Sequence, residues 1–347
     1  MPTTTASPPC ATGISFSSLP TDIVQSHILT RLDGPSLTSA TCATAVLNSM
    51  SERNHRLWSD VCHLTWPSTS GEAVNGIINS FSGNGPKSFF SQSFPLPSPD
   101  PTVASSSSPE CRKLVNMTSC TLISAVDIYH HNKLIFTKTE ETETISNWFQ
   151  CSPFRLDLLH PKDTIPTEIP HPDEDATCTP LTDDLTLSWI LIDPEFKLAL
   201  NLSSHRPVSV QRHWLTGDVR IHFASVLAGG DHSRSSEAMA LVQFGITVNC
   251  GRSEGGEMHV REVSMEVEDM DGKHLNGRDS LVILQRAMRG KRGNGVNREK
   301  EAIKRYKKFE EMKRERRERK LRVEETLDTL SVAFGLSVFV ALFFIFC

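Results

Sequence analysis

Side chains that could do chemistry are few in this sequence and stand far apart. His130 and His131 are adjacent, and neighbouring side chains of a strand point to opposite faces, so we expect the two rings not to share a metal ion. Asp269 and Asp271 begin a calcium-loop pattern whose later oxygen ligands and closing glutamate are missing. Motifs of serine hydrolases, zinc proteases and phosphate-binding loops are also missing. The sequence therefore predicts no catalytic residue, no metal ion and no cofactor.

One pair of side chains favours ligand recognition instead. Arg212 and Trp214 are separated by one residue, so they would lie on one face of an extended segment. A guanidinium and an indole placed in this way can stack on, and hydrogen-bond to, an acidic or sugar ligand. The alternative is an edge strand whose arginine only covers apolar surface.

Composition and charge limit the classes of protein to which the chain can belong. The 347 residues predict two or three domains, and 38% hydrophobic residues suffice for a core in part of the chain. Nine cysteines without a Cys-x-x-Cys pair predict reduced thiols in a cytosolic protein. The net charge of −5 conceals a basic segment at residues 286–322. Such a segment suits an anionic surface, but its interleaved glutamates argue against nucleic acid as a partner.

Residues 111–290 have the pattern of a β-rich domain. Apolar and polar side chains alternate in several segments bounded by turn residues: 185–192, 219–223, 242–248 and 263–267. Because no long helices separate these segments, an antiparallel sandwich or barrel is favoured. The segment 279–288 is predicted to be a closing helix.

Residues 15–62 are predicted to form a small helical unit. Pro20 suits the first turn of a helix, and Asp22 favours the positive end of its dipole. The sequence Asp33-Gly34-Pro35 ends this helix and starts another. Three helices of this size bury little surface, so the unit needs a partner to cover its apolar side.

This unit resembles the F-box. The residues that carry the resemblance are Leu-Pro-x-Asp-Ile at 19–23, Ile-Leu-x-x-Leu at 28–32, a proline-containing loop, a Cys/Ala-rich helix and Leu57-Trp58. Stretches around Trp148, 187–194 and 211–217 are similar to a group of plant F-box proteins. The resemblance implies binding to a Skp-type adaptor of a cullin ubiquitin ligase, with an unknown protein substrate selected by the β-rich domain. It places these residues in the adaptor face: Leu19, Pro20, Ile23, Ile28, Leu32, Leu37 and Trp58.

Two other interpretations stay open. The helical unit could be a structural cap packed on the chain's own body, which would leave a carbohydrate- or ligand-binding sandwich that uses Arg212 and Trp214. An enzyme with a non-standard site is the third hypothesis, although no acid–base or nucleophile constellation supports it.

Two segments of biased composition flank the β-rich domain. Residues 1–14 are expected to be disordered, and residues 63–110 form a predicted Ser/Pro-rich linker. Within it, Phe81, Phe89, Phe90 and Phe94 indicate either a strap against the next domain or a short partner motif. Residues 291–329 are predicted to form a basic helix, because Glu→Lys/Arg pairs recur four residues apart.

The last eighteen residues, 330–347, carry no charge. As a helix they would span about 27 Å, which predicts a transmembrane tail anchor on the cytosolic face of a membrane, with the endoplasmic reticulum as candidate. Its anchoring residues would be Leu330, Phe334, Phe339, Leu342, Phe343, Phe344 and Phe346. The alternatives are a buried terminal helix or a partner-binding segment, with the protein in the cytoplasm or nucleus. The predicted fold class is therefore α+β: a three-helix F-box, an antiparallel β-sandwich-like middle domain, a long basic helix and a single hydrophobic tail helix.

Overall fold

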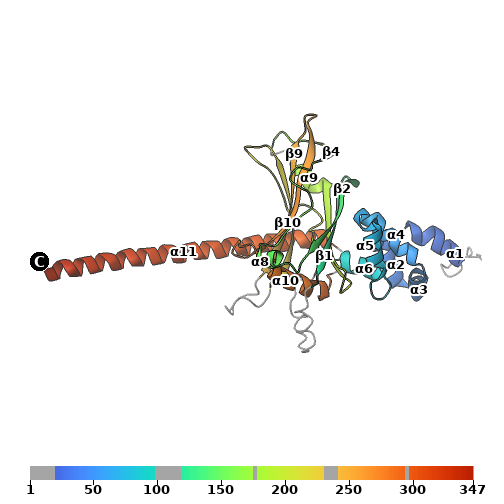
Figure 1. The fold of residues 1–347 in the computed structure, drawn as a ribbon, viewed down its shortest axis with the longest axis horizontal. Helices are drawn as coiled ribbons and strands as arrows, with labels where there is room; N and C mark the ends of the chain where they lie inside the picture. Colours follow the sequence, from blue (N-terminus) through green and yellow to red (C-terminus); the bar gives the residue numbers. More distant parts are fainter. Residues whose placement is uncertain (1–19, 98–118, 175–177, 230–240, 294–296, 347) are drawn as a thin grey trace, which may run out of the picture. The chain divides into compact units, whose positions relative to one another are not determined.

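The fold is known from a computed structural model, shown in Figure 1. It describes residues 20–97, 119–174, 178–229, 241–293 and 297–346. The predicted disordered segment 1–14 and Leu19 lie outside these residues. The chain divides into two compact units between Thr65 and Trp66. We call them the N-terminal unit and the β-rich unit.

The N-terminal unit is entirely helical. Its elements are α1 (Thr21–Ile23), η2 (Val24–Ile28), η3 (Leu29–Arg31), α2 (Gly34–Ala43), α3 (Ala45–Arg53) and α4 (His55–Thr65). Asp33 caps α2 by accepting a hydrogen bond from the Ser36 amide at 3.0 Å. Thr44 is extended and caps α3 through the Leu47 amide at 3.2 Å, so α2 and α3 are two separate helices. The unit thus has more helical elements than the three predicted, and α4 continues three residues beyond the expected end of the unit at Cys62.

Two antiparallel sheets form the β-rich unit. The four-stranded sheet has the order β2-β1-β5-β6, and the six-stranded sheet has the order β3-β10-β9-β8-β7, with β4 also paired to β10. The strands are β1 (Thr121–His130), β2 (Lys133–Glu143), β3 (Arg155–Asp157), β4 (Ile165–Pro170), β5 (Leu185–Asp193), β6 (Leu198–Asn201), β7 (Ser209–Arg212), β8 (Val219–Ala228), β9 (Leu241–Arg252) and β10 (Glu257–Asp269).

Both sheets contribute to one hydrophobic core. Trp189 of the first sheet and Phe223 and Phe244 of the second are fully buried members of the same cluster. The four strands expected from alternation of apolar side chains are β5, β8, β9 and β10, and the predicted closing helix is α10 (Gly277–Arg289). The prediction of a mixed α+β fold with antiparallel sheets is confirmed.

Much of the predicted linker is helical. It contains η4 (Pro67–Ser70), α5 (Glu72–Asn79) and α6 (Pro86–Ser93). The physical reason is aromatic packing, since the Trp66 ring centroid lies 5.8 Å from that of Phe89 and 5.3 Å from that of Phe90. Of the two alternatives for the phenylalanines, the strap against the β-rich domain fits, because the Trp66 indole also donates to Ser188 of β5 at 3.2 Å.

The remaining helices are α8 (Asn147–Cys151), α9 (Thr179–Asp184) and α11 (Arg298–Phe346). The basic helix and the tail helix, predicted as two elements, form the one unbroken helix α11 in Figure 1. Its first part is anchored, because Phe309 is buried against Val226 and Met270. No element in the described part of the chain combines the length and apolarity of a membrane-crossing helix.

The predicted tail anchor is therefore not supported. Phe343 and Phe344 lie outside the residues whose side chains are described. The other predicted anchor residues are exposed on α11, so the alternative of a buried terminal helix is wrong for them: Leu330, Phe334, Phe339, Leu342 and Phe346.

Candidate functional site

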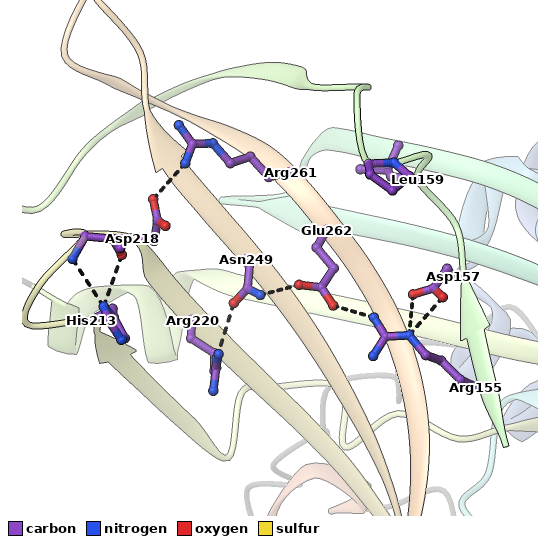
Figure 2. A pocket seen from close by; sticks show the side chains of 11 residues that line it. Arg155, Asp157, Leu159, His213, Asp218, Arg220, Asn249, Arg261 and Glu262 are labelled. Carbon is purple, nitrogen blue, oxygen red and sulfur yellow. Dashed lines mark hydrogen bonds and ion pairs between the residues drawn. The ribbon is translucent and has the colours of Figure 1, made fainter. Parts of the chain in front are cut away.

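A charged pocket of about 590 Å³ opens on the six-stranded sheet. Figure 2 shows its walls, which come from β3, β8, β9, β10 and the turn between β7 and β8. The lining residues are Arg155, Asp157, Leu159, Pro161, His213, Thr216, Asp218, Arg220, Asn249, Arg261 and Glu262. The pocket thus collects three arginines and three carboxylates from parts of the sequence that are far apart.

Strand alternation explains why these polar side chains share a face. Val219 and Ile221 are buried, so Arg220 between them points away from the core. On β9, Asn249 lies in the same way between two buried residues. Arg220 and Asn249 are direct cross-strand partners.

A β-bulge brings two further side chains to this face. The register of β10 against β9 shifts between Val260 and Glu262, so Arg261 is the additional residue. Both Arg261 and Glu262 are consequently directed away from the core, whereas Val260 and Val263 are buried. Without the bulge, one of the two polar side chains would point inward.

A continuous row of polar contacts crosses the four strands (Figure 2). Arg220 Nε donates to Asn249 Oδ1 at 3.3 Å, and Asn249 Nδ2 donates to Glu262. Arg155 Nη2 lies 2.8 Å from Glu262 Oε1, and its Nε lies 2.8 Å from Asp157 Oδ2. On the opposite wall, Arg261 Nη1 lies 3.1 Å from Asp218 Oδ1.

These contacts favour the charged forms of Glu262 and Arg155. Burial alone would raise the pKa of Glu262, but hydrogen bonds from Ser264, Asn249 and Arg155 outweigh it and hold the pKa below its usual range. The hydrogen bond to Asp157 raises the pKa of the Arg155 guanidinium. Among the described residues, no carboxylate lies within ion-pair distance of Arg220. Its guanidinium can therefore donate hydrogen bonds to an incoming carbonyl or carboxylate, while Glu262 and Asp157 provide acceptors.

The predicted pair Arg212 and Trp214 lies beside the pocket rather than in it. Arg212 is the last residue of β7 and packs over Gly217, and Trp214 stands in the turn that follows. They do not share a strand face. Trp214 is 84% exposed and its neighbours His213 and Thr216 line the pocket, so an accessible indole stands at the pocket's rim. The roles of both residues in ligand binding stay predictions.

The expected geometry of the two adjacent histidines is wrong. His131 lies in the turn after β1 with φ +47°, so the alternation of a strand does not apply to it. The ring centroids of His130 and His131 are 4.3 Å apart.

Three curated proteins of Arabidopsis thaliana are similar to the chain over most of its length. A probable F-box protein is 45% identical over 334 residues, covering 96% of this chain and 93% of the relative. Two further F-box proteins are 41% and 39% identical, covering 82% and 95% of the chain and 77% and 96% of the relatives. The chain belongs to a family of plant F-box proteins. No family model matches the sequence, and no solved structure is similar to it.

The predicted adaptor-binding residues of this F-box protein divide into two groups. Pro20 and Ile23 are exposed, and Ile28 and Leu32 are partly exposed, so these side chains are available to a partner. Leu37 and Trp58 are buried and belong to the packing of the unit itself.

Sequence patterns did not reveal the charged pocket of this F-box protein. Its central residues Arg155, Arg220, Asn249 and Glu262 come from four strands, and only the pairing register brings them together. The available signal for Arg155, Arg220 and Asn249 was a polar side chain between two apolar ones. This pattern does not distinguish a pocket wall from an ordinary solvated face.

Proposed function

We propose that this F-box protein is a substrate-recognition subunit of a Skp–cullin–F-box ubiquitin ligase. Its N-terminal unit holds the Skp-type adaptor, and the charged pocket of its β-rich unit holds part of a protein target. The chain performs no bond chemistry in this role. It raises the effective concentration of a target lysine near the conjugating enzyme.

Exposed apolar side chains on a small helical unit support the adaptor contact. Ile23 is 44% exposed although it lies in the first helical turn of the unit. Ile28 and Leu32 are only partly covered. Burial of an isoleucine against a partner contributes about 1.5–3 kcal/mol, so covering such side chains favours a complex.

The chemistry of the charged pocket supports a peptide-like target. Arg220 offers a hydrogen-bond donor and Glu262 an ionised acceptor on one wall, and Trp214 offers an apolar face at the rim. A polypeptide presents carbonyls, amides and side chains of both charges at once. An anion alone would meet the three carboxylates as well as the three arginines.

Co-purification with a Skp-type adaptor tests the first contact. We expect Ile23→Asp to weaken binding by at least about a hundredfold, because an unpaired carboxylate in a docking face costs several kcal/mol. The matched control is Val46→Asp, which changes a 59% exposed β-branched residue of the same unit outside the predicted face. Equal adaptor recovery for the wild type and Ile23→Asp contradicts the proposal, and so does an equal loss for both variants.

The second contact is tested on target ubiquitination. Arg220→Glu should reduce the ubiquitinated proteins that co-purify with the complex while adaptor binding is kept, because Arg220 lies in the pocket and not in the N-terminal unit. The exposed indole of Trp214 is the observation that supports the alternative of carbohydrate binding. Glycan binding by the intact protein that is lost in Trp214→Ala, together with unchanged ubiquitination in Arg220→Glu, favours that alternative.

A further inference from the structure

The hairpin between β1 and β2 is closed by a two-residue turn that carries a histidine. His130 pairs with Lys133, so only His131 and Asn132 form the loop. Both have positive φ, +47° and +62°, as a two-residue hairpin turn requires. Glycine is the usual choice at such positions, and asparagine and histidine are among the other residues that adopt positive φ most readily. Positive φ has a free-energy cost for a residue with a side chain, so the contacts of the His131 side chain are of interest.

The imidazole of His131 meets a carboxylate from another element. Asp184 is the last residue of α9, and the next residue, Leu185, pairs with His130 across β1 and β5. The His131 amide donates to the Asp184 carbonyl at 3.0 Å. His131 Nε2 lies 3.4 Å from Asp184 Oδ2. The pairing of His130 with Leu185 and the hydrogen bond from the His131 amide to Asp184 therefore fix the backbone positions of His130, His131 and Asp184.

We propose that His130, His131 and Asp184 bind a Zn²⁺ ion or a similar borderline transition-metal ion. One ligand atom from each of the three lies within 4.8 Å of the others. Two atoms that bind zinc at about 2.0–2.1 Å with a tetrahedral angle are about 3.3–3.4 Å apart. The separation of His131 Nε2 and Asp184 Oδ2 has this value. The His130 nitrogen lies within 4.8 Å of the other two ligand atoms and would have to move closer to bind the same ion.

The donor set determines the class of ion. Two imidazole nitrogens and one carboxylate oxygen suit zinc, nickel or copper, whereas calcium and magnesium prefer oxygen ligands alone. Three protein ligands leave a fourth position for water or for a group from another molecule. Lys133, opposite His130 in the hairpin, forms an ion pair with Glu168, which compensates its positive charge.

A simple ion pair between His131 and Asp184 is the competing explanation. Such a pair at the surface contributes about 0–1 kcal/mol and gives no role to His130. A bound cation gives all three side chains a favourable arrangement.

Zinc titration of the purified full-length chain against a chromophoric chelator tests the site. We expect binding of one Zn²⁺ at this site and at least about tenfold weaker affinity in His131→Asn and in Asp184→Asn. Asparagine tolerates the positive φ of position 131, so His131→Asn removes the imidazole and keeps the turn. The matched control His160→Ala removes an exposed histidine elsewhere and should leave the affinity unchanged.

A second measurement separates this site from the cysteines of the chain. Substituting Co²⁺ gives a visible spectrum whose near-ultraviolet region lacks thiolate charge-transfer bands if nitrogen and oxygen ligands hold the ion. Absence of Zn²⁺ binding by the wild type overturns the proposal. Equal affinities for the wild type, His131→Asn and Asp184→Asn, or thiolate bands from bound Co²⁺, overturn it as well.

Discussion

Asp127 shows how one buried carboxylate connects the first helices of the β-rich unit to its sheet. The side chain is fully buried on β1. It accepts hydrogen bonds from the Ser68 amide at 2.9 Å, the Ser68 hydroxyl at 2.5 Å and the Thr137 hydroxyl at 2.7 Å. Burial raises the pKa of the carboxyl, and the bonds from Ser68 and Thr137 offset part of that rise. The contact therefore depends both on geometry and on the ionisation of one group.

We expect Asp127→Ala to lower the free energy of unfolding by about 2–4 kcal/mol, because two donors of the buried Ser68 and the Thr137 hydroxyl lose their acceptor. The matched control is Asp163→Ala at an exposed position, where we expect a change within about 0.5 kcal/mol. Urea denaturation followed by tryptophan fluorescence measures both. A loss for Asp127→Ala no larger than for the control would show that η4 is held by its other contacts.

The raised pKa of Asp127 gives this difference a pH dependence. Between the ordinary value of 3.8 and the raised value, the folded state binds more protons at this group than the unfolded state. The contribution of Asp127 to stability consequently increases as pH falls through that window. The difference in unfolding free energy between the wild type and Asp127→Ala should be larger at pH 4 than at pH 7. The opposite trend would mean that the pKa is lowered in the folded protein.

At the scale of elements, sequence patterns correctly predicted the strands and helices that depend on neighbouring residues in the chain. Alternation located β8 and β10, and the apolar spacing of 279–288 located α10. The composition of residues 67–94 favoured a linker, whereas packing of Phe89 and Phe90 on Trp66 stabilises helices there. The charged pocket depends on the bulge at Arg261 and on pairing between distant strands. Neither packing partners nor register can be obtained from the sequence pattern alone.

Substitutions at two glycines separate the effect of helix propensity from the effect of packing against a neighbouring helix. A Cβ at Gly277, the first residue of α10, would lie 2.1 Å from the Phe149 carbonyl oxygen of α8. A Cβ at Gly76 in α5 would meet no atom within 4 Å. We expect Gly277→Ala to destabilise the protein by about 1–3 kcal/mol and Gly76→Ala to stabilise it by about 0.5–1 kcal/mol.

Thermal and urea unfolding of the two glycine variants, compared with the wild type, check the signs. Both substitutions add the same methyl group within a helix, so helix propensity alone predicts stabilisation in both. If Gly277→Ala were also stabilising, α8 would have to move away from α10 at little cost.

At the scale of the whole molecule, the proposed binding sites for the adaptor, the target and the metal ion lie in different parts of the sequence. The exposed Ile23 belongs to the N-terminal unit. The charged pocket and the proposed metal ligands His130, His131 and Asp184 belong to the β-rich unit. Within the β-rich unit, α11 has two parts with different surroundings. Phe309 is buried, and Lys313 and Lys320 pair with Glu268 and Asp271 at 2.9 Å. From Leu321 onwards, the described side chains are exposed.

Truncations of α11 should therefore have unequal effects on stability. The described side chains of residues 323–347 are all exposed, so removal of this segment should change the free energy of unfolding of the β-rich unit by less than about 0.5 kcal/mol. Removal of residues 298–347 also deletes Phe309 and uncovers Val226 and Met270, so we expect a loss of at least about 3–5 kcal/mol. In the full-length chain, Phe309→Ala should reproduce most of the larger effect. Urea denaturation of the three variants measures these differences, and a large loss on removing residues 323–347 alone would show that the distal helix packs on the body in solution.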